Sequence, residues 1–183
     1  MRKPNIILTG FMGSGKTTVG KLLARQLDYR FVDTDQLIEE RSGLTIPEIF
    51  RQKGEAAFRA LETEIARELA TEQGMVISTG GKLMLDAVNA EVLAAGGRVF
   101  SLIASPEETL KRVSMDSAHK RPLLDTVDPL DAIVSLLQER RQGYGQFCEI
   151  DTTGKSPEEV RDDLLAIFHK NPVPAPSPPG EKE

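Results

Sequence analysis

The segment Gly10-Phe-Met-Gly-Ser-Gly-Lys-Thr17 constrains this chain most, because it fits the pattern G-x-x-x-x-G-K-[ST]. It follows the short apolar run Asn5 to Thr9 and leads into an amphipathic stretch from Lys16 to Leu27. In such a loop between a strand and a helix, glycines let backbone N–H groups converge on phosphate oxygens, and the helix N-terminus adds a favourable dipole. The segment therefore predicts a phosphate-binding loop (P-loop). The alternative is a glycine-rich turn that happens to precede a helix.

Each residue type in this loop has a chemical reason to be there. Lys16 is expected to reach the β- and γ-phosphates of ATP, and the Thr17 hydroxyl is expected to ligate Mg²⁺. The candidate nucleotide-binding residues are Gly13, Ser14, Gly15, Lys16, Thr17 and Thr18. The motif indicates the donor nucleotide and says nothing about the acceptor, since a transporter or a GTPase would use the same loop.

The rest of the chain alternates short apolar runs with helical patterns. After the first run, strands are predicted at Phe31 to Asp33, Met75 to Thr79, Arg98 to Ala104 and, as a fifth candidate, Phe147 to Thr152. Helices are predicted at Lys16 to Leu27, Gln36 to Arg41, Ile46 to Gln52, Glu55 to Ala70, Asp86 to Ala95, Pro106 to Met115, Pro129 to Gln142 and Pro157 to His169. Such alternation favours βαβ units, and hence an α/β fold with a parallel sheet covered by helices on both faces.

Length and composition limit the organisation. With 183 residues and 39% hydrophobic content, one domain is expected, over residues 1–170. The segment 171–183 is rich in proline and lacks apolar periodicity, so a disordered tail is expected there. The single cysteine, Cys148, excludes an internal disulfide and fits a reducing, cytoplasmic location.

Charge and hydropathy weigh against two classes of partner. The net charge of −5 and the isoelectric point near 5.2 argue against a broad nucleic-acid surface, which normally has a basic excess. No run approaches the roughly 20 apolar residues of a membrane span. The expected partners are therefore small molecules, and a monomer is expected.

Residues on the acceptor side are less specific. Asp33 and Asp35 flank the end of the second predicted strand, where one carboxylate can hold Mg²⁺-bound water and the other can orient an acceptor hydroxyl. Alternatively, Asp35 only caps the helix beginning near Gln36. Arg59 stands beside an apolar stripe and is either a ligand or a solvated side chain. Gly80 and Gly81 follow the third strand, where a backbone donor site and a bare turn are equally compatible with the sequence.

Taken together, six ordered pieces of this sequence resemble the shikimate kinase family. They are the P-loop, Asp33-Thr-Asp35, Phe58-Arg59-Ala-Leu-Glu62, Gly80-Gly81, Arg121-Pro122-Leu123-Leu124 and Glu139-Arg140. The resemblance covers nearly the whole chain except the tail. It implies a three-layer α/β/α P-loop kinase fold like that of adenylate kinase, with a five-stranded parallel sheet and a mobile lid at about residues 115–124. It also implies MgATP-dependent phosphorylation of the 3-hydroxyl of shikimate.

The resemblance assigns roles at matching positions. It implies that Asp35 holds the acceptor hydroxyl, and that Arg59, Gly81 and Arg140 bind the rest of shikimate, the arginines through its carboxylate. Arg121 corresponds to the lid arginine that neutralises charge on the transferred phosphoryl group. Thr17 and Asp33 are the expected metal residues, and Lys16, Asp35 and Arg121 the expected catalytic ones.

Helical spacing does not by itself choose Arg140. One stripe, Ile133, Leu136 and Arg140, directs that residue inward, whereas the alternative stripe Ile133, Val134, Leu137 and Arg141 favours its neighbour. Only the resemblance selects Arg140.

The sequence departs from the family pattern in two places. Lys82 stands where the family has a third glycine, which places a cation at the edge of the expected acceptor pocket. Gln142-Gly143-Tyr144 replaces the usual Pro-Leu-Tyr, and Gly143 is expected to loosen the helix end at a cost of about 1 kcal/mol. The alternatives are a related kinase for another polyol acid such as gluconate, or a catalytically weak nucleotide-binding module.

Overall fold

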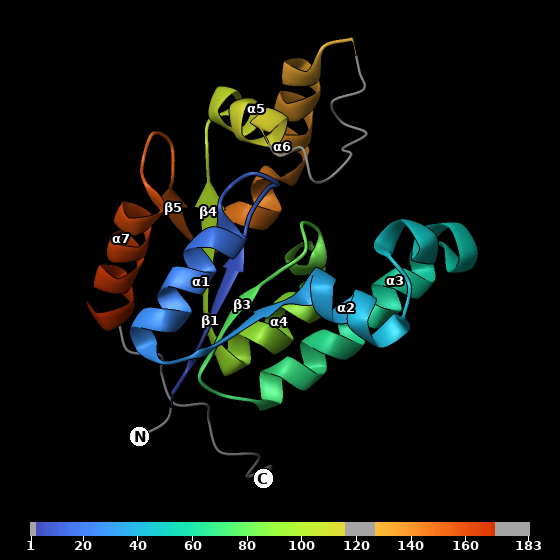
Figure 1. The fold of residues 1–183 in the computed structure, drawn as a ribbon, viewed down its shortest axis with the longest axis horizontal. Helices are drawn as coiled ribbons and strands as arrows, with labels where there is room; N and C mark the ends of the chain where they lie inside the picture. The colour runs from blue at the N-terminus through green and yellow to red at the C-terminus, as the bar shows by residue number, and fades with distance from the viewer. Residues whose placement is uncertain (1–2, 116–126, 171–183) are drawn as a thin grey trace, which may run out of the picture.

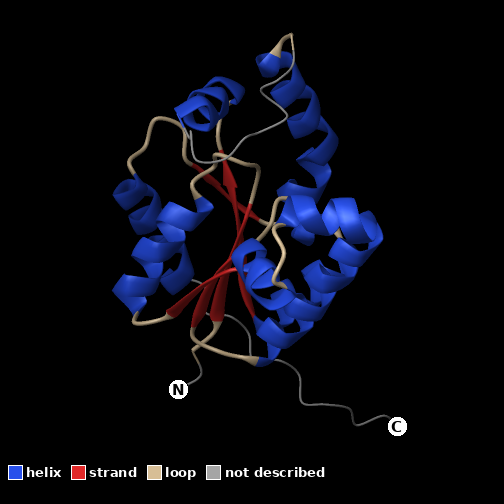
Figure 2. Cartoon of the chain, turned by 45° about the vertical axis from the view of Figure 1, so that its right-hand side comes forward, coloured by secondary structure: helices blue, strands red, loops and turns tan. Residues whose placement is uncertain are grey.

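The computed structural model describes residues 3–115 and 127–170, which form one parallel β-sheet between layers of helices (Figures 1 and 2). The sheet has five strands in the order β2-β3-β1-β4-β5, all parallel. The strands are β1 (Asn5–Thr9), β2 (Arg30–Asp33), β3 (Met75–Ser78), β4 (Gly97–Ile103) and β5 (Cys148–Asp151). The predicted α/β class with a five-stranded parallel sheet is confirmed, and the predicted strand bounds agree within one residue.

Side chains of β1 alternate between the two faces of the sheet, as the strand period of two requires. Ile6 and Leu8 pack with helices α1 (Lys16–Leu27) and α7 (Pro157–Lys170). Ile7 packs on the other face, in the core shared with α2 (Thr34–Ser42), α3 (Ile46–Thr71) and α4 (Ala87–Gly96). Two cores thus hold β1, and the loop that follows it, in a fixed place at the centre of the sheet.

Two helices lie beyond the carboxyl ends of the strands, at the top of Figure 1: α5 (Pro106–Met115) and α6 (Pro129–Gly145). They pack around a third, smaller core of Phe11, Ile133 and Tyr144. The short 3₁₀ turn η1 (Leu83–Leu85) completes the described elements. Because Phe11 belongs to the glycine-rich loop, this third core joins the loop directly to α6.

Helix α3 is two helical segments separated by a kink at Gly54, where φ is 81° and ψ is 171°. This corresponds to the two helices predicted on either side of residue 54. The first segment begins with a capping box in which the Thr45 N–H donates to the Glu48 carboxylate, as predicted. The predicted box at Ser156 and Glu159 also forms at the start of α7.

The structure decides one open alternative about helix ends and overturns one expectation. Helix α2 begins at Thr34, and Asp33 is its cap, with Oδ1 accepting from the N–H groups of Asp35 and Gln36 at 3.1 and 3.4 Å. Strand β2 therefore ends before Asp35, and Asp35 is free of the capping role. The helix end was expected to loosen at Gly143, and this is wrong. Helix α6 continues through Gly143 to Gly145.

Some predictions fall on residues that the structure does not describe. The expected lid reaches into residues 116–126, and only its first residue, Met115, is described. Arg121 and the tail at 171–183 also lie outside the described residues. Within residues 3–115 and 127–170, no helix combines the length and the apolar content that crossing a bilayer requires.

Candidate active site

The glycine-rich loop connects β1 to α1 and uses backbone conformations that favour glycine. Gly10, Gly13 and Gly15 have φ values of 136°, 73° and 94°. A Cβ at Gly10 would lie 2.3 Å from the Leu102 carbonyl oxygen, so no larger residue fits there. The loop follows the central strand and opens α1, the arrangement that directs N–H groups toward phosphate oxygens.

The Lys16 ammonium group lies within the loop itself. Its Nζ donates to the backbone oxygens of Gly10 and Phe11, each at 2.9 Å. These contacts hold the side chain across the mouth of the loop. A cation held in this position is already oriented to bind negatively charged phosphate oxygens.

A cleft of about 730 Å³ opens at the carboxyl ends of β1, β2 and β3. Ligands bind at this edge in open α/β sheets, at the point where successive connections leave in opposite directions. The cleft is lined by Met12, Gly13, Gly15, Lys16, Thr17, Thr18, Asp33, Asp35, Gln36, Glu39, Ile46, Ser78, Thr79, Gly80, Gly81 and Arg140. Residues from the glycine-rich loop and from the predicted acceptor side thus line one space.

Two oxygen groups in the cleft suit a small divalent cation. The Thr17 hydroxyl donates to Asp33 Oδ2 at 3.1 Å, so a hydroxyl and a carboxylate oxygen lie side by side at the start of α1. Mg²⁺ prefers oxygen ligands and usually keeps several waters, so it needs only one or two protein groups. The described residues contain no cluster of three or more His, Cys, Asp or Glu side chains that could form a full protein cage. Thr17 and Asp33 therefore fit a Mg²⁺ ion that also binds phosphate oxygens of a nucleotide.

Asp35 lies deeper in the cleft, in the first turn of α2. Burial, together with the nearby carboxylates of Asp33 and Glu62, raises the pKa of its carboxyl from 3.8 to about 6, and Lys16 opposes part of this rise. Its Oδ1 is buried and has no hydrogen-bond partner among the described residues. A buried acceptor without a partner is costly and is suited to receive a hydroxyl from a ligand.

Gly80 fixes one wall beside Asp35. A Cβ at Gly80 would lie 2.4 Å from Asp35 Oδ1, so glycine is needed for the carboxyl to occupy this place. The Gly80 N–H donates to the buried hydroxyl of Thr34 at 2.9 Å, which ties the loop after β3 to the start of α2. Lys82, two residues further on, is exposed and does not line the cleft.

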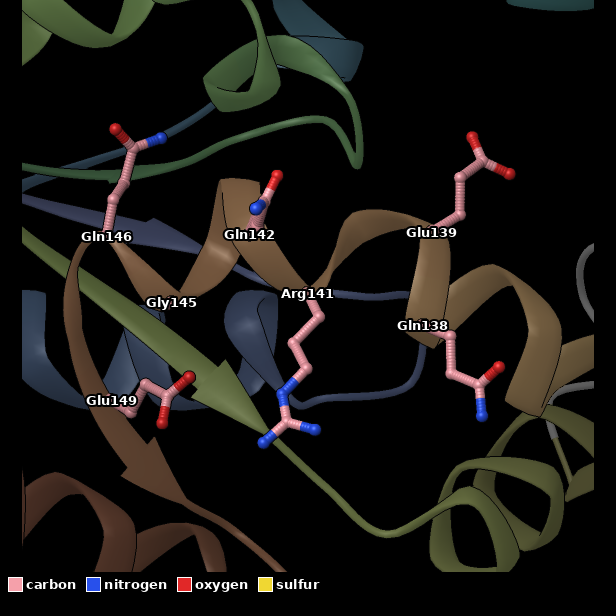
Figure 3. Close-up of a pocket in the computed structure, with 7 residues that line it drawn as sticks. All are labelled: Gln138, Glu139, Arg141, Gln142, Gly145, Gln146 and Glu149. Atoms are coloured by element: carbon pink, nitrogen blue, oxygen red, sulfur yellow. The ribbon is translucent and has the colours of Figure 1, made fainter.

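Arg140 and Arg141 follow each other on α6 but have different surroundings. Arg140 lines the cleft, its guanidinium carbon is 5.3 Å from the centre of the Phe11 ring, and its Nε is buried without a partner among the described residues. Arg141 lines a separate, shallow pocket of about 580 Å³, and Figure 3 shows its side chain pointing away from those of Glu139 and Gln142. The structure therefore places Arg140, and not Arg141, with the predicted site residues.

Arg59 is not among the residues lining the cleft. Its guanidinium donates to the Glu62 carboxylate, which is buried, and to Glu55 at 3.0 Å. Burial raises the pKa of Glu62, and the Arg59 ion pair opposes that rise. Because Glu62 also acts on the charge of Asp35, this ion pair is electrostatically linked to the cleft.

Sequence reasoning missed Arg112 of α5. Its guanidinium donates to the Gly13 carbonyl at 3.3 Å and to the Thr152 carbonyl at 2.7 Å, and it pairs with Glu108. It therefore joins the glycine-rich loop to the segment after β5. The i, i+4 spacing from Glu108 was visible in the sequence, but it indicates only a surface ion pair. The two carbonyl contacts could not be read from it.

Comparisons with known proteins agree on one family. A family model described as shikimate kinase matches residues 12–168. A shikimate kinase of Geobacter sulfurreducens is 47% identical over 168 residues, covering 91% of this chain and 92% of the relative. One of Thermus thermophilus is 42% identical over 161 residues, covering 87% of each chain.

Solved structures show the same likeness. A shikimate kinase from Acinetobacter baumannii in complex with shikimate has a TM-score of 0.84 and 36% identity, and the match covers 94% of this chain and 96% of that one. A gluconokinase from Sinorhizobium meliloti has a TM-score of 0.59 and 19% identity, covering 93% and 94%. The second likeness shows a shared fold and nothing more.

Proposed function

The chain belongs to the shikimate kinase family, and we propose that it transfers the γ-phosphoryl group of ATP to the 3-hydroxyl of shikimate. One observation carries the proposal: a single cleft is lined by Lys16 and Thr17 of the P-loop on one side and by Asp35, Gly81 and Arg140 on the other. Donor and acceptor groups thus face the same space, which a phosphoryl transfer without an enzyme-bound intermediate requires.

The donor half consists of the P-loop and the start of α1. Backbone N–H groups of Gly13, Ser14 and Gly15 bind the phosphates, and Thr18 adds a hydroxyl at the helix start. Lys16 exchanges its two carbonyl contacts for phosphate oxygens and neutralises charge on the transferred group. Thr17 and Asp33 hold Mg²⁺, which supplies further positive charge when bound.

The acceptor half consists of groups that bind a polyol acid. Asp35 accepts a hydrogen bond from the 3-hydroxyl and aligns it with the γ-phosphate, while its raised pKa makes it a better proton acceptor than an exposed aspartate. Arg140 binds the carboxylate, and Gly81 contributes backbone contacts. We further propose that Arg59 reaches the same carboxylate when acceptor binds, and that Arg121, outside the described residues, contacts the phosphates.

A coupled assay that follows ADP release tests the proposal with purified protein, ATP, Mg²⁺ and shikimate. Multiple turnover is expected, and Lys16→Ala is expected to abolish it. Thr18→Ser, which keeps the hydroxyl, serves as a control for changes near the loop. Nucleotide binding without turnover of shikimate would contradict the proposal and would favour a nucleotide-binding module.

A second acceptor, gluconate, remains the competing candidate because Lys82 stands where the family has glycine. The exposed position of Lys82, outside the cleft, favours shikimate. Comparing kcat/KM for shikimate and gluconate, in the wild type and in Lys82→Gly, decides between them. A preference for gluconate that Lys82→Gly reverses would establish the alternative.

The family and the cleft point to small-molecule substrates. We further propose that the chain acts as a monomer, because both halves of the cleft come from one chain. We also propose a cytoplasmic location and a single domain over residues 1–170. Sedimentation velocity at several protein concentrations tests the monomer. A mass twice that of the chain would contradict it.

A further inference from the structure

Tyr144 in the last turn of α6 has a contact that the proposed chemistry does not use. Its side chain is 5% exposed, and its hydroxyl donates to the backbone oxygen of Gly81, which is 63 residues away in the sequence. A buried tyrosine hydroxyl normally needs a partner, and here the partner belongs to the acceptor half of the cleft. The contact therefore joins α6 to the loop after β3.

Arg140 precedes Tyr144 by one helical turn and acts electrostatically on the same hydroxyl. Burial raises the pKa of the Tyr144 hydroxyl, and a hydrogen bond from the Arg140 guanidinium opposes that rise. Nη1 of Arg140 lies 3.8 Å from the place that a Cβ on Gly81 would occupy. The hydroxyl of Tyr144 and the guanidinium of Arg140 thus both lie against the Gly81 backbone.

A close contact next to Tyr144 fixes the position of α6 relative to η1. A Cβ at Gly143 would lie 2.4 Å from Leu85 Cδ2, so α6 approaches η1 as closely as a glycine permits. The helix continues through Gly143 to Gly145. Leu85 of η1 occupies the space that a side chain at residue 143 would need.

From these contacts we infer that Tyr144 is a positioning residue, which sets the spacing between the Arg140 guanidinium and the Gly81 backbone for the carboxylate end of the acceptor. The inference rests on the proposed function. Because C=O and N–H of a trans peptide point in opposite directions, holding the Gly81 carbonyl also fixes the direction of the Lys82 N–H. Lysine keeps this donor, so the acceptor half can work without the third glycine.

Tyr144→Phe tests the inference because it removes only the hydroxyl. The expected result is a KM for shikimate raised about tenfold, the loss expected for one charge-linked hydrogen bond, with kcat and the KM for ATP changed less than about twofold. Tyr29→Phe is the matched control, since Tyr29 and Tyr144 are the two tyrosines of the chain and Tyr29 packs against the α1 and α7 core. Its kinetics are expected to equal those of the wild type.

A double-mutant cycle separates positioning from simple stability. In an Arg140→Ala background, Tyr144→Phe is expected to raise the KM for shikimate by clearly less than tenfold further, because the spacing to the guanidinium no longer matters and only the effect on the Gly81 backbone remains. Loss of stability alone would instead give the same factor in both backgrounds. Equal factors would overturn the inference.

A spectroscopic measurement gives an independent readout. The chain has no tryptophan, so Tyr29→Phe leaves Tyr144 as the sole tyrosine. Titration of this variant with shikimate is expected to shift the near-ultraviolet absorption of Tyr144, because a carboxylate on Arg140 changes the hydrogen bond to the phenol. Turnover of shikimate by the wild type, with an unchanged KM in Tyr144→Phe, would overturn only the positioning role. A wild type inactive on shikimate would overturn the proposed function as well.

Discussion

At the scale of single residues, Arg140 and Arg141 differ in surroundings although they are neighbours on α6. We expect Arg140→Ala to raise the KM for shikimate roughly 10- to 10²-fold, because a charge-assisted contact to a carboxylate contributes about 1.5–3 kcal/mol. Arg141→Ala is the matched control, with the same change of charge on the other side of the helix. Steady-state kinetics of both variants give the comparison. Equal effects of the two substitutions on the KM for shikimate would contradict the assignment of the carboxylate to Arg140.

Asp35 gives a prediction about stability. The folded state holds its pKa at about 6, above the ordinary 3.8, so the native protein binds this proton more tightly than the unfolded chain. The free energy of unfolding therefore falls as pH rises from 3.8 to about 6, by up to about 3 kcal/mol, and stays lower above that range. Asp35→Asn removes the destabilisation that ionisation of this buried carboxyl causes. We expect the variant to be more stable than the wild type at pH 8 and equal to it below pH 3.8.

Urea unfolding across this pH range, without nucleotide or metal, measures the effect. The same variant should lose roughly 10²-fold in kcat, because asparagine orients the acceptor hydroxyl poorly. Asp28→Asn is the control, since the Asp28 side chain is fully exposed. A stability difference between Asp35→Asn and wild type that does not change with pH would contradict the assigned cause.

Single residues also show where sequence reasoning stops. The P-loop is visible because its glycines and its lysine follow a fixed local pattern. The sequence does not show which of Asp33 and Asp35 caps the helix and which faces the acceptor. Either carboxylate can cap a helix, and the end of β2 decides which one does. The choice between Arg140 and Arg141 depends on how α6 is rotated against Phe11, a tertiary contact that helical periodicity does not contain.

At the scale of elements, the kink in α3 has a measurable consequence. Gly54 adopts φ 81° and ψ 171°, a region that is essentially restricted to glycine. We expect Gly54→Ala to lower the free energy of unfolding by about 1–3 kcal/mol. The KM for the acceptor should also rise, since the segment before the kink carries Ile46, which lines the cleft.

Chemical unfolding and steady-state kinetics of the variant test this prediction. Gly145→Ala is a suitable control, because a Cβ there meets nothing closer than 3.6 Å and the backbone angle is ordinary. If both substitutions cost the same stability, the backbone of Gly54 would not be the cause.

Elements were predicted best where local signals agree. The strands carry apolar runs and the capping boxes at Thr45 and Ser156 have their partners three residues away, so both are nearly local in the sequence. The end of α6 was predicted wrongly because Gly143 disfavours a helix by itself. Its close approach to Leu85 compensates for that tendency, and this contact joins elements that are far apart in the sequence.

At the scale of the whole molecule, the cleft lies between elements that are held together mainly by the sheet. A ligand that binds only the folded protein stabilises it by about 2.7 kcal/mol at a concentration 100 times its Kd. For MgADP we therefore expect a rise in Tm of roughly 5–10 °C at that concentration. Lys16→Ala should abolish most of this rise. Differential scanning calorimetry measures both, and an equal rise in the variant would contradict the role of Lys16.

The strand order has a consequence for how this family can diversify. The P-loop follows β1, whereas the acceptor-side residues lie at the ends of β2 and β3 or just after them, on one side of β1. Selection can therefore alter the loops after β2 and β3 and the inner face of α6 while the nucleotide loop stays unchanged. Such an arrangement lets copies of one ancestral kinase gene acquire new acceptors while ATP remains the donor. The boundary between the inherited and the variable parts of the site then runs between β1 and β3.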